Sequence, residues 1–271
     1  MQKTTQPEKG NLLMGRRWYS PRYPGIGILT LIMLVILPGV LLAQRVPRPV
    51  VPEWAYPGSA THTQVPPPPN FHRATRTDLT PIGIFRGQSD VGGALVPGAS
   101  GYDRATGQYT ITSAGYNIWY TRDEFRYLWK KMSGDVSLAA DVNFPDSAGY
   151  GDRKAVLVIR QTLEDNSREA MVALHGGGLI HLAYRPQKGA DLKEMRVPEK
   201  SALRIGIEKH GDAFSIYVSM HGEPMHKVGH DVNLHIRGPF YVGIGFCSHQ
   251  PIIPDTAILS NLVLVNAAGK L

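Results

Sequence analysis

The stretch ALRIGIEKHGDAFSIYVSMHG, residues 202–222, decides the fold class of this chain. Before the tetrapeptide KHGD, every second residue from Leu203 onward is apolar, and the alternation returns after it at Phe214, Ile216 and Val218. Side chains of a β-strand point alternately to opposite faces, so this period predicts two strands that each bury one face. Gly-Asp between two such runs is typical of a tight antiparallel hairpin. We therefore expect a β-hairpin whose apolar face packs on a core.

Other short segments with the residue types of β-strands occur along most of the chain. They are short, rich in β-branched and aromatic residues, and bounded by Gly, Asp or Asn. The segments are QYTITSA (108–114), NIWYT (117–121), RYLWKKM (126–132), VSLAADVNF (136–144), KAVLVIRQT (154–162), EAMVALHG (169–176), LIHLAYR (179–185), FYVGIGFCS (240–248) and ILSNLVLV (258–265). Many short strands without alternating helices predict an all-β fold, an antiparallel two-sheet jelly-roll sandwich over residues 81–271.

The order of four longer stretches resembles a known family. These are YLWKKMSGDVSLAADVNF, RKAVLVIRQTLEDNSREAMVALHGGGLIHLAYR, LRIGIEKHGDAFSIYVSMHG and FYVGIGFCSHQPIIPDTAILSNLVL. Together they resemble the concanavalin A-like (lectin/glucanase, laminin-G-like) jelly-roll domains, in particular the uncharacterised bacterial type often fused to TolB-like propellers. The resemblance covers about residues 82–266 and implies a sandwich. Its motifs are mainly structural, so it says little about function. A membrane anchor and a proline-rich segment are expected here in place of the propeller.

An uncharged apolar run spans residues 25–43, inside RRWYSPRYPGIGILTLIMLVILPGVLLAQ (16–44). A helix that crosses the hydrocarbon core needs about 20 such residues. The apolar stretch of a cleaved secretory signal is usually about 7 to 15 residues long. We therefore expect a retained transmembrane helix, a signal-anchor, at residues 25–44. The alternative is cleavage after Ala43, which would leave Leu41 where a small residue is expected.

The residues around this run predict its orientation. Basic residues are concentrated before it, so residues 1–24 are expected in the cytoplasm and the C-terminal domain in the periplasm, anchored by a single pass in a bacterial inner membrane. The rings expected at the two membrane interfaces are Trp18, Tyr19, Tyr23, Trp54 and Tyr56. Residues 45–80 are proline-rich and predict a stiff tether. Because much of the net charge of +7 lies before the run, no nucleic-acid partner is expected.

Catalytic residues are not indicated by any motif. No strand carries the spaced carboxylates of a glycosidase. Glu164, Asp165 and Glu169 are interpreted as a solvated turn in QTLEDNSREA. The single cysteine, Cys247, cannot form an internal disulfide and is expected to be a small buried apolar residue. Its neighbour His249 shares its strand face, but proximity alone is weak evidence for a reactive thiolate. The sequence indicates no cofactor.

Metal ligands are at most weakly indicated. The segment DVNFPDSAGYGD offers Asp141, Asn143, Asp146 and Asp152, oxygen donors of the kind that calcium prefers, but it lacks a calcium-loop signature. The alternative is a polar surface loop.

The histidines are numerous but scattered. His175 and His181 flank a glycine-rich turn that could bring them opposite each other, and His226 and His230 are four residues apart. We expect these histidines to be exposed residues on a polar face rather than ligands, because a transition metal needs three or four converging groups.

Sugar-binding candidates gather in YNIWYT. Tyr116, Asn117, Trp119 and Tyr120 combine aromatic rings with a planar amide. The alternative places Trp119, like Trp129, in the sandwich core. Strict strand alternation would also put Trp119 and Tyr120 on opposite faces.

The favoured function is that of a non-enzymatic, membrane-anchored accessory subunit, which binds other subunits of a respiratory, photosynthetic or transport-related membrane complex. The observations behind it are the expected anchor, the proline-rich tether and the lack of a catalytic constellation. The alternative is a lectin-like carbohydrate-binding module at the cell envelope, with glycans as partners. A divergent glycoside hydrolase is the least favoured function.

Overall fold

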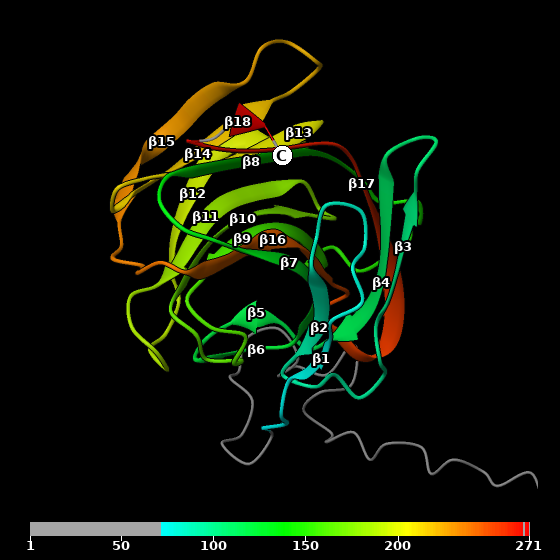
Figure 1. Ribbon diagram of the computed structural model, residues 1–271. Coiled ribbons are helices and arrows are strands. Elements are labelled where there is room, and N and C mark those ends of the chain that lie inside the picture. Colours follow the sequence, from blue (N-terminus) through cyan, green and yellow to red (C-terminus); the bar gives the residue numbers. More distant parts are fainter. Residues whose placement is uncertain (1–71, 268, 271) are drawn as a thin grey trace, which may run out of the picture. The chain divides into compact units, whose positions relative to one another are not determined.

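The computed structural model describes residues 72–267 and 269–270, which form strands, turns and loops (Figure 1). The predicted cytoplasmic segment, the predicted membrane helix with its interface rings, and most of the predicted tether lie outside these residues. Within the described ranges, no helix has the length and apolarity needed to span a membrane.

The strands form two large antiparallel sheets and one small one. The first sheet has the order β1 (Arg76–Asp78), β2 (Gly87–Val91), β7 (Phe125–Met132), β16 (Phe240–Cys247), β9 (Lys154–Arg160), β10 (Glu169–His175), β11 (Leu179–Arg185), β12 (Lys193–Lys200). The second has the order β15 (His226–Asn233), β14 (Ala213–Ser219), β13 (Arg204–His210), β8 (Val136–Asn143), β17 (Gln250–Asn266), β4 (Gln108–Gly115), β3 (Ala99–Asp103), with β18 (Gly269–Lys270) paired to β17. The small sheet is the hairpin β5 (Ile118–Trp119) and β6 (Arg122–Asp123). The predicted all-β, antiparallel two-sheet sandwich is confirmed.

The hairpin predicted from the alternating pattern is β13–β14. Its register runs from Arg204 opposite Ser219 to His210 opposite Ala213. Gly211 in the turn has a φ of 58°, a conformation that side chains with a Cβ rarely adopt. One expectation was wrong, because Leu203 is 45% exposed. It precedes the first paired residue of the strand, so the alternation no longer holds its side chain against the core.

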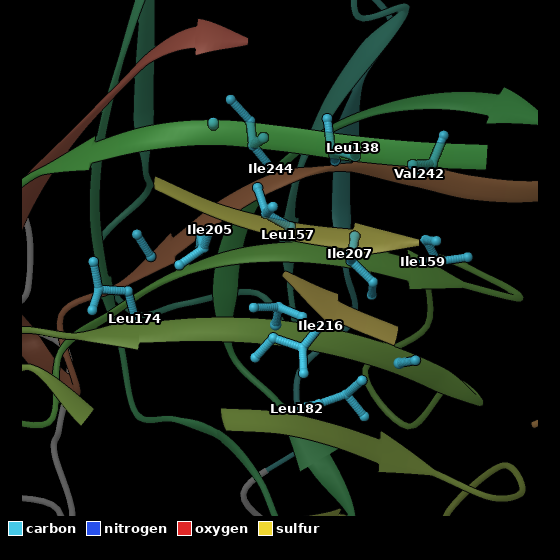
Figure 2. Packing of buried hydrophobic residues seen from close by; sticks show 14 of the residues in the cluster. Leu138, Leu157, Ile159, Leu174, Leu182, Ile205, Ile207, Ile216, Val242 and Ile244 are labelled. Atoms are coloured by element: carbon cyan, nitrogen blue, oxygen red, sulfur yellow. The ribbon is translucent and has the colours of Figure 1, made fainter. Parts of the chain in front are cut away.

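The core lies between the two large sheets (Figure 2). Leu157 of β9 and Ile244 of β16 come from the first sheet, and Ile207 of β13 and Ile216 of β14 come from the second; all four are at most 1% exposed. Full burial of such a side chain contributes about 1.5–3 kcal/mol. This interior is what the alternating segments of the sequence encode.

Some strands carry too weak an apolar signal to be predicted. The edge strands β12 and β15 contain mostly charged and polar residues, because an edge strand buries only a few side chains. The short strand β1, Arg76–Asp78, falls inside the segment 45–80 that the sequence assigns to the tether, and it pairs with β2. The first sheet therefore begins before residue 81.

The first sheet also buries its outer face, defined here as the face turned away from the second sheet. Tyr127, Trp129, Val158 and Met171 form a second apolar cluster there with Ile118 of the β5–β6 hairpin. Figure 1 shows this hairpin on the side of the first sheet opposite to the second sheet. The hairpin and the loops around it divide the outer face into a sealed part and an open part.

Candidate functional site

The open part of the outer face is a pocket of about 170 Å³ beside the β5–β6 hairpin. The register of the sheet brings its polar side chains together. Lys154 of β9 lies opposite His175 of β10, and His181 of β11 lies opposite Arg196 of β12. Glu194, two residues before Arg196, points to the same face because strand side chains alternate. Four neighbouring strands therefore line one polar cavity.

Two histidines and a carboxylate form a connected chain in this pocket. The Nε2 atoms of His175 and His181 are 3.3 Å apart, and His181 Nδ1 lies 2.6 Å from Glu194 Oε1. Arg196 Nε donates to Glu194 Oε2 at 2.9 Å. Burial would raise the pKa of Glu194, but the hydrogen bonds from His181 and Arg196 outweigh it and lower the pKa to about 2. Glu194 is thus ionised and fixes the His181 ring.

Burial keeps both imidazoles neutral at neutral pH. It lowers the pKa of His175 to about 4, and it also lowers the pKa of His181. The two side chains are 6% and 1% exposed, so the expectation of solvent-exposed histidines was wrong for this pair. The glycine turn does bring them close together, as diagonal neighbours on β10 and β11 because His181 lies opposite Ala173, but on the face that the hairpin covers. The Trp119 ring lies 5.8 Å from the His181 ring at 18°.

Lys154 is the buried cation of the pocket wall, with 2% of its surface exposed. Its Nζ donates to Asn117 Oδ1 at 2.7 Å and lies 5.8 Å from the centre of the Trp119 ring. Burial lowers the pKa of this amine. None of the ion pairs formed among residues 72–267 involves Lys154.

The backbone around the pocket is unusual. Tyr120 and His249 both line it, and both have positive φ angles, 51° and 63°. Such conformations cost about 1–3 kcal/mol in residues other than glycine and often occur at functional sites. The His249 ring stacks on Tyr150, with ring centres 5.3 Å apart.

The residues predicted for sugar binding are largely brought together here. Asn117, Trp119 and Tyr120 line the pocket, whereas Tyr116 is buried behind it, 6.4 Å from the His249 ring. Strand β5 ends at Trp119, and the positive φ of Tyr120 turns the chain, so both rings reach one cavity despite the alternation rule. Trp119 is partly exposed, whereas Trp129 is buried in the outer cluster.

The sealed part of the outer face holds a charged cluster of four side chains, all 0% exposed: Asp123, Glu169, Arg160 and Arg185. Asp123 of β6 binds Arg185 through both carboxylate oxygens, at 2.6 and 2.9 Å. Arg160 and Arg185 are the two cross-strand neighbours of Glu169. Burial, together with the nearby Asp123 carboxylate, raises the pKa of Glu169 to about 8. The cluster fastens the hairpin to the sheet.

The prediction that Glu164, Asp165 and Glu169 all lie on a solvated turn was wrong for two of the three residues. Glu164 is exposed on a turn, as expected. Asp165 is only 4% exposed and pairs with Arg122 at 3.0 Å and with His72 at 2.7 Å. Glu169 is the first residue of β10 and is fully buried. Two facing guanidinium groups make that burial possible, and the surrounding sequence does not reveal them.

The calcium candidates are spread over different surroundings. Asp141 pairs with Arg204 at 2.6 Å and accepts a hydrogen bond from Asn261. Asn143 ends β8, Asp146 accepts a hydrogen bond from the Ala148 amide, and Asp152 lines the pocket. Throughout the described chain, no three His, Cys, Asp or Glu side chains form a group that could hold a metal ion. Calcium binding stays a prediction.

The remaining candidates are structural or exposed. Cys247 is fully buried, as expected, and burial raises its pKa to about 12, so it stays a thiol. Its Sγ accepts a hydrogen bond from the His249 amide at 3.4 Å, so the two residues adjoin without an activated thiolate. His226 and His230 are exposed on β15, as expected.

A larger cavity, about 470 Å³, lies beside His72, Arg122, Asp165 and Lys188. Its charged groups are already paired, Arg122 and His72 with Asp165, and Lys188 with Glu164. The smaller pocket differs because it presents a buried cation without an ionic partner and two strained backbone positions. We therefore take the smaller pocket as the candidate functional site.

Comparison with known proteins identifies no family for this chain. No family model and no curated protein matches the chain. Similar solved structures include a functionally unknown protein from Saccharomyces cerevisiae, 12% identical, covering 63% of this chain and 93% of that one, with a TM-score of 0.49. The carbohydrate binding module CBM66 from Bacillus subtilis is 14% identical, covering 62% and 91%, with a TM-score of 0.41. A xylan β-1,4-xylosidase from Bacillus halodurans is 13% identical, covering 58% of this chain but only 32% of that one, with a TM-score of 0.44.

Proposed function

We propose that the sandwich is a carbohydrate-binding module and that a saccharide binds in the pocket beside Trp119. The observation that carries this proposal is the partly exposed indole ring next to polar groups from several strands. A sugar ring has an apolar face of C–H groups and a rim of hydroxyls. An aromatic ring suits the first, and fixed donors and acceptors suit the second.

The polar groups of the pocket are held in place before any ligand arrives. Glu194 is bound by His181 and Arg196, and Asn117 is bound by Lys154. Stacking on His181 orients the Trp119 ring. Side chains that are already ordered lose little entropy on binding, so this arrangement favours a ligand-binding role.

The acids of the outer face favour binding over hydrolysis. A glycosidase needs one carboxylic acid with a raised pKa to protonate the leaving group. In the pocket, the nearby His175 imidazole lowers the pKa of Asp152, and the hydrogen bonds from His181 and Arg196 lower the pKa of Glu194. The Asp123 and Glu169 carboxylates face each other on this sheet, but both are sealed from solvent. Asp152 and Glu194 are therefore ionised, and Asp123 and Glu169 are out of reach of a sugar. None of these four acids could protonate a leaving group in the pocket.

The expected anchor would hold this pocket at the outer surface of the inner membrane. Membrane attachment, the periplasmic location and association with a membrane complex all depend on residues 25–44, which lie outside the described part of the chain. The pocket itself favours the saccharide over a protein subunit as its occupant, because it is small and polar.

Replacing Trp119 with alanine is expected to weaken saccharide binding by about tenfold or more, since central aromatic contacts often contribute over 1 kcal/mol. The fold should persist, because Trp119 belongs to a two-residue strand outside the main core. Binding of the full chain in detergent would be measured on a glycan array and then by calorimetry. The matched control is Tyr217→Ala, which removes a ring from β14 of the second sheet.

Two outcomes would contradict the proposed function. One is an unchanged glycan profile for Trp119→Ala. The other is a wild-type protein that binds no glycan of a broad panel and instead co-purifies with a membrane protein at fixed stoichiometry, which would support the accessory-subunit role.

A further inference from the structure

The ammonium group of Lys154 lacks a counter-ion. Lysine is almost never fully buried unless it is paired, because an ammonium group loses its hydration in the interior. Lys154 is 2% exposed, and its Nζ donates to the neutral oxygen of Asn117. The residue belongs to the wall of the candidate pocket rather than to the sealed cluster.

Two acids line the pocket, and neither forms an ion pair with this lysine. Glu194 accepts hydrogen bonds from His181 and Arg196. Asp152 faces His175, 3.7 Å from its Nδ1, and about half of its side chain is exposed to solvent. Neither carboxylate comes within 4.0 Å of Lys154 Nζ.

The Asp123 carboxylate also acts on Lys154 from the sealed cluster, where it is bound to Arg160 and Arg185. The cross-strand neighbours are His175, which burial keeps neutral at neutral pH, and Cys247, which burial keeps protonated. Arg196 adds a second cation at the rim, where its side chain is 68% exposed. A bound anion would therefore meet a desolvated ammonium group in the wall and a guanidinium group at the edge.

From this juxtaposition we propose that the saccharide carries an anionic group, a carboxylate or a sulfate ester, which pairs with the ammonium group of Lys154. The inference rests on the proposed function and names the class of saccharide. A neutral sugar leaves the buried cation without a counter-ion, whereas an anionic sugar supplies one in a place where water screens the interaction poorly. Charge would then decide specificity, because a buried charged partner discriminates strongly against a ligand that lacks it.

Two pairs of ligands whose members differ chiefly in charge test this proposal. Full-length protein is titrated with an oligogalacturonate and with its methyl ester, in which the same sugar chain has masked carboxylates. A sulfated oligosaccharide and its desulfated form make a second pair, which separates the two sources of charge. We expect about tenfold tighter binding, or more, of the charged member of at least one pair.

Lys154→Met should remove this preference without weakening the fold. The matched control is Lys193→Met, which removes the same charge from an exposed position on β12. Without ligand, Lys154→Met should unfold at the same temperature as the wild type or a higher one, because a desolvated and unpaired charge disappears. A lower unfolding temperature would identify Lys154 as a structural residue and would overturn the inference.

The remaining outcomes separate the inference from the function on which it rests. Equal binding of both members of each pair, or binding of neutral saccharides alone, overturns the anionic class but leaves a carbohydrate-binding module. A preference for the charged ligand that persists in Lys154→Met also overturns the inference, because the charge is then recognised elsewhere. Failure of the wild type to bind any saccharide, charged or neutral, contradicts both.

Discussion

Replacing Arg185 with methionine is expected to lower the free energy of unfolding by about 3–5 kcal/mol, the cost of leaving a buried ion pair with one partner. Arg185 binds both Asp123 and Glu169, and all three side chains are 0% exposed. Loss of the guanidinium leaves Arg160 as the cation that faces two carboxylates in the sealed cluster. Urea denaturation followed by tryptophan fluorescence would measure the change.

The control variant removes an ion pair that is exposed to solvent instead of buried. Lys188 and Glu164 are paired at 2.5 Å, but their side chains are 60% and 58% exposed. Lys188→Met should change the unfolding free energy by about 0–1 kcal/mol, since solvent screens such a pair. If Arg185→Met were as mild as Lys188→Met, the cluster would not fasten the β5–β6 hairpin to the sheet.

The contribution of His175 to stability is expected to fall by about 3 kcal/mol as the pH drops from about 6.5 to about 4. Burial lowers the pKa of His175 from 6.5 to about 4. The folded protein therefore binds fewer protons than the unfolded chain in this window, so acid favours unfolding. The contribution is fully present above pH 6.5 and is lost as the pH falls through the folded pKa.

Groups around His175 act in both directions. Asp152 raises its pKa, whereas Lys154 and His181 lower it, and burial is the largest cause. Burial also lowers the pKa of His181, so that residue adds to the loss in the same direction. The loss from Glu194 comes at lower pH, between 4.5 and about 2. Chemical denaturation across the pH range would resolve these windows.

His175→Gln should remove this contribution between pH 6.5 and 4, so the variant is expected to be less stable than the wild type at pH 7 and to lose less of its stability in acid. His226→Gln, at an exposed position of β15, is the control and should leave the curve unchanged. The raised pKa values of the buried acids Glu124 and Glu169, about 7 and about 8, stabilise the fold as the pH falls, so the test is the difference between wild type and variant. An equal change of stability with pH in His175→Gln and in the wild type would contradict the buried, neutral state of His175.

The sequence was most informative where a strand buries one face. In the hairpin of residues 204–219, apolar residues alternate because Ile205, Ile207, Phe214 and Ile216 face the core and their neighbours do not. Such a pattern is local, so a single sequence carries it. Edge strands bury little, and β12 and β15 therefore gave no signal strong enough to predict.

The predicted exposure of acidic residues was wrong where segments distant in the sequence meet. The sequence predicts a solvated turn for Glu169 because acids are usually exposed, yet this residue is buried between Arg160 and Arg185. Asp123, which completes this cluster, is 62 residues from Arg185 in the chain. No local pattern shows that a carboxylate so far away will cover the same patch of sheet.

The pocket contains residues that the local sequence indicated and residues that it did not. Asn117, Trp119 and Tyr120 were recognisable from their residue types, and the glycine turn indicated that His175 could lie opposite His181. The sequence by itself determined the all-β class and the strands of the sandwich interior, because alternation along a strand reports burial directly. Only the tertiary structure decided that Lys154, Glu194 and Arg196 share one cavity with those aromatic rings. Sheet register and hairpin packing bring them together, and both depend on contacts between segments far apart in the chain.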